Sequence, residues 1–319
     1  MNLKQFYESA VQFGLKNDFR STKEIKADLS RVEKDYKQLK GVAKKLFDKE
    51  RMKHPYADTR ILNGELTKKI KTILVGIDME VPEILLADRL NEKGLVIDLV
   101  LAHHPEGKAL SKLGEVMHLQ KNGLEKFGIK KEMAVSLMDD RIAEVSRSLL
   151  TVNHTRAVDA AKLLNMTYMC VHTPADNHVN TYLTRLFAKK KPKKVKDVLN
   201  ILYQIPEYQQ AALIGAGPTQ ISGKPDDDAG KIMIEMTGGT EGSKKVFARL
   251  SQAGVQTIIG MHFSETHYTN AKEEKINLII AGHISSDNLG LNLLFDNIEK
   301  KHGSLNILGC SGFKRVKRK

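Results

Sequence analysis

The stretch LVIDLVLAHHP at residues 95–105 is an apolar run that ends in two histidines and a proline. Similar short apolar runs recur after residue 55, and segments with helical periodicity separate them. Strands that alternate with helices predict an α/β protein with a largely parallel or mixed sheet covered by helices. We expect strands at residues 72–77, 95–102, 168–171, 212–214, 231–236, 257–259, 278–281 and 305–308. We expect helices at residues 81–92, 110–125, 141–149, 155–164, 196–204, 243–253 and 288–301.

The first 68 residues have a different pattern, which predicts a helical hairpin extension before an α/β region at residues 69–319. Apolar residues recur four and three positions apart, as in a helix that packs on a partner helix. They are Ile25, Leu29, Val32, Tyr36, Leu39, Ala43 and Leu46. The segment that contains Leu3, Phe6, Val11 and Leu15 is the expected antiparallel partner.

The composition is that of a globular protein, with 41% apolar and 28% charged residues among 319. No apolar run approaches the roughly 20 residues that span a bilayer, and the amino-terminal segment lacks the apolar core of a signal peptide. The two cysteines, Cys170 and Cys310, are far apart, which argues against a disulfide framework. We therefore expect a cytoplasmic protein without a membrane partner.

Two basic clusters carry much of the net charge of +13. They are Lys189, Lys190, Lys191, Lys193, Lys194 and Lys196, followed by Lys314, Arg315, Lys317, Arg318 and Lys319. Such clusters are able to bind nucleic acid or an acidic partner. No aromatic residues alternate with them to stack on bases, so a solvated linker and tail is the favoured interpretation.

Five of the eleven histidines follow expected strands directly: His103, His104, His172, His262 and His283. In open α/β sheets, ligands bind beyond the carboxyl ends of the strands. Four expected strands therefore bring imidazoles to one edge of the sheet, which predicts a binding site there.

The segments around these histidines supply carboxylates as well. VHTPADNHVN at 171–180 contains Asp176 and His178, and AGHISSDN at 281–288 places Asp287 four residues after His283. Nitrogen and oxygen donors without thiolates suit Zn, Mn, Fe, Co or Ni. Two alternatives stay open. One residue of the His103–His104 pair can be a hydrogen-bonded loop residue rather than a ligand, and Asp287 can be a helix N-cap.

The ordered combination of HHP, HT-x-x-D and GH-x-x-x-acid resembles the Nif-three-like family, the GTP cyclohydrolase 1 type 2 homologues. The similarity includes IDMEVPEIL at 77–85 and spans about residues 70–310. The resemblance implies two divalent metal ions and self-association, with toroidal hexamers typical of the family. It implies the metal ligands His103, His104, Asp176, His283 and Asp287. The last position is usually glutamate in the family, so the shorter Asp287 side chain is a departure.

Other polar residues near the strand ends are candidates for catalysis or ligand orientation. GMHFSETHYTN at 260–270 offers Glu265 or His267 as a general base or substrate contact, although a surface loop is an equally good interpretation. Glu106 is a candidate hydrogen-bond partner for an imidazole of the HHP motif.

These residues favour a metal-dependent hydrolase of a nucleotide, a pterin-like compound or another phosphate-containing small molecule, with Asp176 bridging two ions. The alternative is a non-catalytic metal-binding scaffold or regulator that docks nucleic acid or an acidic partner through its basic clusters.

Overall fold

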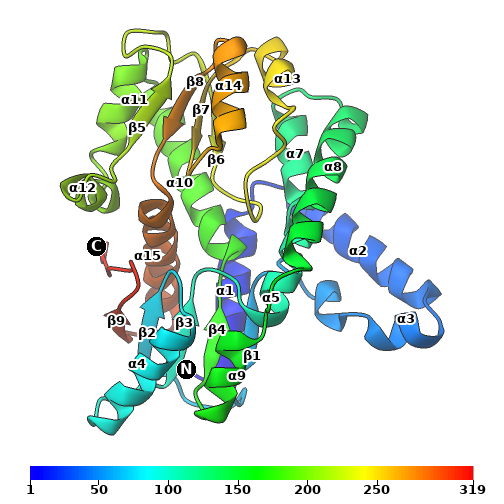
Figure 1. Ribbon diagram of the computed structural model, residues 1–319, viewed down its shortest axis with the longest axis vertical. Coiled ribbons are helices and arrows are strands. Elements are labelled where there is room, and N and C mark those ends of the chain that lie inside the picture. The colour runs from blue at the N-terminus through cyan, green and yellow to red at the C-terminus, as the bar shows by residue number, and fades with distance from the viewer. Residues whose placement is uncertain (319) are drawn as a thin grey trace.

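The computed structural model describes residues 1–318, and it contains two β-sheets rather than one (Figure 1). The first sheet has the order β1-β4-β3-β2-β9. Its strands are β1 (Arg60–Asn63), β2 (Thr72–Gly76), β3 (Leu99–Ala102), β4 (Tyr168–Cys170) and β9 (Asn306–Gly309). Only β1 runs antiparallel to its neighbour. The expected α/β class with mixed, helix-covered sheets is confirmed.

The second sheet has the order β5-β8-β7-β6, and its edge strand β5 is antiparallel to β8. Its strands are β5 (Thr219–Ser222), β6 (Lys231–Glu235), β7 (Val255–Gly260) and β8 (Asn277–Ile280). The two sheets occupy the lower and upper halves of the molecule in Figure 1. We expected the histidines at the carboxyl ends of the strands of one sheet. In the structure, those strands belong to two sheets.

Helices cover both sheets and connect them. They are α1 (Leu3–Asn17), α2 (Thr22–Gln38), α3 (Gly41–Leu46), the 3-10 helix η1 (Lys49–Met52), α4 (Val81–Glu92), α5 (Gly107–Ser111), α6 (Leu113–Val116), α7 (His118–Lys126), α8 (Lys131–Leu149), α9 (Arg156–Leu163), α10 (Thr173–Lys190), α11 (Val195–Leu202), α12 (Pro206–Leu213), α13 (Phe247–Gln252), α14 (Glu265–Glu273) and α15 (His283–His302). Within residues 1–318, none of these helices combines the length and apolar character needed to cross a bilayer.

Helices α10 and α15 pack on each other and link the halves of the molecule (Figure 1). Helix α10 follows β4 of the first sheet, and α15 follows β8 of the second. Both helices contribute buried residues to the cores of both sheets. At their crossing, a Cβ built on Gly290 would lie 2.6 Å from the carbonyl oxygen of Ala175. This close approach requires glycine and holds the first turn of α10 against α15.

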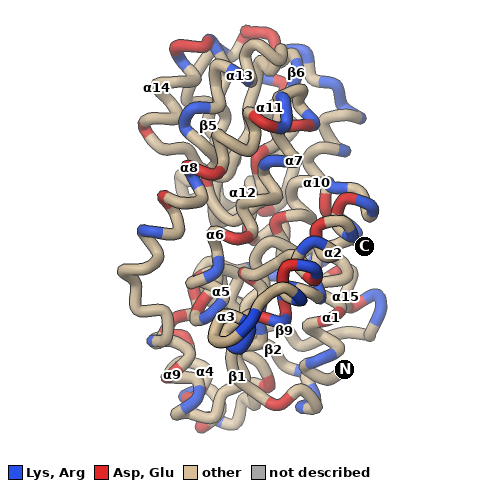
Figure 2. Tube along the Cα trace, turned by 90° about the vertical axis from the view of Figure 1, so that its right-hand side faces the viewer, with Lys and Arg blue, Asp and Glu red and all other residues tan. Residues whose placement is uncertain are grey.

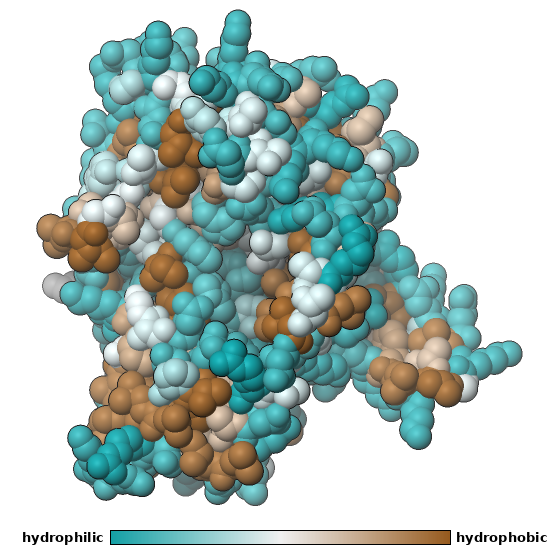
Figure 3. Space-filling model, viewed as in Figure 1, coloured by the Kyte–Doolittle hydropathy of each residue, from teal (hydrophilic) through white to brown (hydrophobic). Residues whose placement is uncertain are grey.

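The expected antiparallel pairing within the first 68 residues is wrong. Helix α1 instead packs on α10 and α15, with Leu3 and Phe6 fully buried. The predicted apolar repeat reaches Leu46, but α2 ends at Gln38 and the backbone of Leu39 is extended. The repeat therefore does not lie on a single helix. Helices α2 and α3 form an arm that projects from the molecule (Figure 1). Apolar surface is visible on this arm (Figure 3), where Val42 and Leu46 are 70% and 76% exposed.

Three other expectations differ from the structure. Residues 212–214 are not a strand, because they form the end of α12 and the residue after it, and Leu213 and Ile214 are highly exposed. An apolar run this short does not distinguish a strand from a helix end. The segment 110–125 is divided among α5, α6 and α7, and α8 begins ten residues earlier than the expected helix at 141–149. Strands β1 and β5 were not expected.

Candidate metal centre

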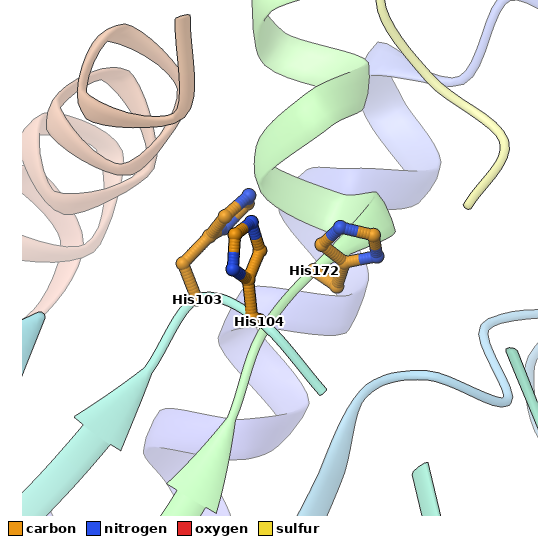
Figure 4. Close-up of side chains that lie close together, drawn as sticks. All are labelled: His103, His104 and His172. Atoms are coloured by element: carbon orange, nitrogen blue, oxygen red, sulfur yellow. The ribbon is translucent and has the colours of Figure 1, made fainter. Parts of the chain in front are cut away.

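The ends of β3, β4 and β8 place four histidines close together. His103 and His104 follow β3, His172 caps α10 after β4, and His283 begins α15 after β8. Figure 4 shows the imidazoles of His103, His104 and His172 side by side where β3 and β4 end. The ring centroids of His104 and His283 are 5.0 Å apart. The site is therefore formed between the strand ends of the two sheets.

One group of donors consists of His103, Asp176 and Asp287. The Nε2 atom of His103 is 3.3 Å from Oδ1 of Asp176 and 3.3 Å from Oδ1 of Asp287. These three donor atoms are buried and have no hydrogen-bond partner among the described residues, and the same is true of Oδ2 of Asp287. Buried polar atoms are normally paired. Unpaired imidazole and carboxylate atoms that face one another fit a metal-binding site.

A second group consists of His104, His283 and Asp287. The Nε2 atoms of His104 and His283 are 3.3 Å apart. Oδ2 of Asp287 is 3.5 Å from Nε2 of His104 and 3.6 Å from Nε2 of His283. The donor atoms of each group lie within 4.8 Å of one another, and His103, His104 and His172 form a third such group. Asp287 is shared by the first two groups, whereas Asp176 belongs to only one of the three.

Each histidine at the end of the first sheet is oriented through its second ring nitrogen. Nδ1 of His103 is 3.1 Å from the carbonyl oxygen of Val171, and Nδ1 of His104 is 2.6 Å from Oδ1 of Asp78. Nδ1 of His172 is 2.9 Å from Oδ2 of Asp58. Acceptors at Nδ1 place the proton there and leave Nε2 free to bind a metal. The rings are therefore held in the tautomer that coordination at Nε2 requires.

His172 is the N-cap of α10, and His283 is the first residue of α15. Each histidine stands at the beginning of its helix, and an aspartate follows four residues later, Asp176 in one case and Asp287 in the other. Nε2 of His172 is 3.8 Å from Oδ2 of Asp176. The ligand set implied by resemblance did not contain His172, although its position directly after a strand was the same signal that marked the others.

Two of the polar residues that the sequence motifs offered, His178 and Glu106, lie outside the cluster. His178 lies farther along α10, where burial lowers its pKa to about 4 and Nδ1 faces the carbonyl oxygen of Pro174. Glu106 makes no hydrogen bond to an imidazole, and burial, with Glu80 nearby, raises its pKa to about 7. Sequence reasoning missed the actual acceptors Asp58 and Asp78, because neither occurs in a recognisable motif.

Electrostatics couple the histidines to the carboxylates. Burial by itself lowers the pKa of His103, but Asp287 and Asp176 more than offset this and raise it to about 10. Burial also opposes protonation of His104, yet Asp287 and Asp78 raise its pKa to about 9. Although burial raises the pKa of Asp287, the two imidazoles hold it well below its usual range. The cluster strongly favours positive charge close to Asp287, as expected of a cation site.

A small cavity of about 50 Å³ lies beside the cluster, and His172, Asp176 and His283 contribute to its wall. His267 also lines it and is buried, with Nδ1 2.6 Å from Oγ of Ser264. Glu265 is exposed at the start of α14 and is not among the lining residues.

The cavity also contains a carboxylate that sequence reasoning did not identify. Oε1 of Glu241 is 2.8 Å from Nδ1 of His262, and Oε2 of Glu241 is 3.4 Å from Nδ1 of His267. The ring of His262 is 4.7 Å from that of His283. The pair of Glu241 and His262 therefore extends from the histidine cluster towards the second sheet.

About half of the basic residues in the two clusters that the structure describes are paired with acids. Arg315 contacts Asp296 and Glu299, and Arg318 contacts Glu207. In the other cluster, Lys194 and Lys196 pair with acidic residues of the loop 226–228. In the view of Figure 2, Lys and Arg are interspersed with Asp and Glu over the length of the molecule. The favoured interpretation of a solvated tail is too simple, because residues 314–318 are attached to α15 through these contacts.

No protein-family model matches the chain, and no curated protein matches it by sequence. Solved structures do. A NIF3 superfamily protein from Sphaerobacter thermophilus is 23% identical and aligns with a TM-score of 0.69, covering 90% of this chain and 98% of that one. Reduced HcgD from Methanocaldococcus jannaschii is 14% identical, with a TM-score of 0.50 and coverage of 89% and 97%.

At these identities the similarity establishes the three-dimensional architecture. It extends over both sheets and almost the whole length of each solved chain. The resemblance inferred from HHP, HT-x-x-D and GH-x-x-x-acid is therefore confirmed at the level of the fold: the chain has the fold of the NIF3 superfamily, with a buried cluster of histidines and aspartates that is able to hold metal.

Proposed function

We propose that the chain binds two first-row divalent metal ions between the strand ends of its two sheets and uses them to hydrolyse a phosphate-containing small molecule. The observation that carries the proposal is the set of four buried donor atoms without hydrogen-bond partners on His103, Asp176 and Asp287. Leaving such groups unpaired costs about 1–3 kcal/mol each. A bound cation removes this cost by coordinating all of them.

The geometry supports one assignment of ligands. His103, His172 and Asp176 would hold the first ion, and His104 and His283 would hold the second, with Asp287 within reach of both. This changes the role suggested from sequence, because Asp176 faces only the side of His103 and His172. The shorter side chain of Asp287 reaches both groups because α15 begins directly at the site.

The cleft side of the cluster leaves room for chemistry. The side chains of His104 and His283 are 25% and 39% exposed, whereas His103 and Asp287 are fully buried. Paired divalent ions with open positions lower the pKa of bound water towards 7 and supply a nucleophile at neutral pH. Across the cavity, Glu241 and His262 are placed to orient a substrate or accept a proton. His267 is a secondary candidate, and Glu265 would first have to turn towards the cavity.

Elemental analysis of protein purified without chelator or metal-binding tag tests the metal assignment. We expect close to two first-row metal ions per chain in the wild type, no bound ion in Asp287→Asn, and one in Asp176→Asn. His118→Gln is a matched control, because His118 is exposed and belongs to none of the groups of metal-binding donors. Wild-type protein that stays metal-free after reconstitution would contradict the proposal, and so would normal metal content in Asp287→Asn.

The hydrolytic part is tested on the same samples. Reconstituted wild type should release phosphate or cleave phosphoesters in a panel of nucleotides and small phosphoesters, and Asp287→Asn should not. Nucleic-acid binding that falls steeply with salt, without turnover of any compound, would instead favour the scaffold alternative. The ion pairs of Arg315 and Arg318 do not favour that alternative, because their charges are already compensated. Light scattering tests the proposed self-association, for which a hexamer is the state implied by resemblance.

A further inference from the structure

A second and much larger cavity, of about 560 Å³, lies along the free edge of the second sheet. Strand β6 forms its floor, and α7 and α10 form opposite walls. A volume of this size is typical of sites for small organic ligands. None of its lining residues belongs to the proposed metal ligands, although Glu235, Met236 and Thr237 also line the small cavity beside the metal centre. It is therefore a separate site that adjoins the metal centre.

The floor of this cavity offers backbone hydrogen-bonding groups. Strand β6 pairs with β7 on one side only, because it is the last strand of its sheet. Its outward N–H and C=O groups form no other backbone hydrogen bond within residues 1–318. An unpaired strand edge presents donors and acceptors in alternation along one line. A ligand that lies in the cavity can pair with them.

The wall formed by α10 adds polar side chains. Asn180 is only 8% exposed, lines the cavity and makes no side-chain hydrogen bond with any other described residue. Its neighbours on the helix are satisfied: Asn177 accepts from Thr237, and Thr181 donates to Asn17. Thr184 lies one turn beyond Asn180 and also lines the cavity. The amide of Asn180 therefore opens onto the cavity with hydrogen-bonding groups that no described residue uses, which points to a ligand with a complementary polar edge.

Besides the charged side chains of Lys126, Lys191 and Glu235, the remaining lining is mostly apolar and contains several aromatic and sulfur-bearing side chains. They are Phe19, Phe127, Phe187, Met138, Met233 and Met236. Aromatic rings and thioethers pack well on flat ring systems. Together with the polar edge of β6 and the amide of Asn180, they define a slot with apolar faces and hydrogen-bonding rims.

Both ends of the slot are closed by hydrogen bonds between α7 and the chain around β6. Nε2 of Gln120 donates to the carbonyl oxygens of Gly238 and Thr240, at 2.9 and 2.6 Å. At the other end, Nζ of Lys231 is 3.1 Å from the carbonyl oxygen of Phe127. An extended peptide added to the edge of β6 would have to pass through these closures. A compact ligand fits between them.

We propose that this cavity binds a flat, uncharged heteroaromatic ring system, with its edge hydrogen-bonded to the backbone of β6 and the amide of Asn180. An acyl chain of similar volume has no polar groups to pair with Asn180 and the edge of β6. Such a ligand is therefore disfavoured. The proposal does not depend on the metal ions, because the two sites use different residues.

Gly123 provides a sharp test, because it lies on α7 in the cavity wall. A Cβ built there meets only the ring of Phe19, at 3.6 and 3.8 Å, which are ordinary contact distances. Gly123→Leu should place its side chain in the cavity without opposing the backbone, and Gly123→Ala is the matched control that leaves most of the volume. The probes are lumichrome and adenosine as uncharged heteroaromatic rings, and dodecanoate as an acyl chain, measured by calorimetric titration.

We expect saturable binding of at least one ring probe to wild type, retained in Gly123→Ala and weakened at least about tenfold in Gly123→Leu. Asn180→Leu should weaken the ring probe and leave or improve dodecanoate. Metal content and thermal unfolding of the variants show that the fold is intact and keep a failure here distinct from a failure of the metal proposal. Absence of ring binding by wild type would overturn the inference, as would affinity that Gly123→Leu and Asn180→Leu leave unchanged. Tighter binding of dodecanoate than of either ring would overturn the ligand class.

Discussion

Asp58 controls the orientation of His172, and its replacement should weaken metal binding without removing a ligand. The Asp58 side chain is fully buried, and its Oδ2 accepts three hydrogen bonds. The donors are Nδ1 of His172 at 2.9 Å, the backbone N–H of Thr173 at 3.2 Å and Oγ1 of Thr173 at 2.6 Å. Burial raises the pKa of Asp58, but these contacts more than offset it and lower the pKa below its usual value.

The magnitude follows from these contacts. Asp58→Asn keeps one acceptor oxygen but loses the charge that strengthens each hydrogen bond, so we expect a loss of about 1–2 kcal/mol in the free energy of unfolding. Partners that orient metal-binding histidines typically contribute about 10–100-fold to metal affinity. Asp58→Ala leaves all three donors buried without an acceptor, and it should cost roughly 3 kcal/mol or more.

Competition titrations with a chelator measure the metal affinity, and denaturant unfolding of the metal-free protein measures stability. Asp98→Asn is the matched control, because Oδ2 of Asp98 accepts from the backbone N–H groups of Lys71 and Thr72, away from the cluster. The control should lose stability but keep its metal affinity. Wild-type metal affinity in Asp58→Asn, combined with reduced stability, would refute the orienting role.

Four further outcomes are expected. The raised pKa values of His103 and His104, about 10 and 9, mean that metal uptake near pH 7 displaces about two protons. Calorimetry in buffers of different ionisation enthalpy should detect this release, and metal affinity should rise with pH. In the metal-free protein, the raised pKa values of these two histidines stabilise the folded state. The stabilisation is complete below the unfolded pKa of about 6.5 and is lost as the pH rises through 9 and 10. A series of denaturant unfolding measurements at different pH values tests it. Gly290→Ala should cost about 1–3 kcal/mol by overpacking against Ala175, and an unchanged melting temperature would contradict the close crossing. Deleting residues 314–319 should lower thermal stability, because Arg315 is paired within the fold; a purely solvated tail would leave stability unchanged.

Much of the site was predictable from local sequence. A short apolar run followed by a histidine marks a strand and the polar residue at its carboxyl end, and this pattern identified His103, His104, His172 and His283. The spacing of four between His283 and Asp287 places both on one face of a helix. These inferences hold because strand and helix periodicity are properties of the local chain.

Local sequence patterns therefore predicted the α/β class, the strands that carry the histidines and the nitrogen and oxygen donors of the site. The tertiary structure alone decided that the strand ends belong to two sheets. It also decided that α10 and α15 cross closely enough at Gly290 to bring Asp287 between the two groups of donors. The acceptor Asp58, the separation of α1 from α2 and the cavity beside β6 likewise depend on contacts between distant residues. Local periodicity carries no information about such contacts, because they arise only when whole elements pack.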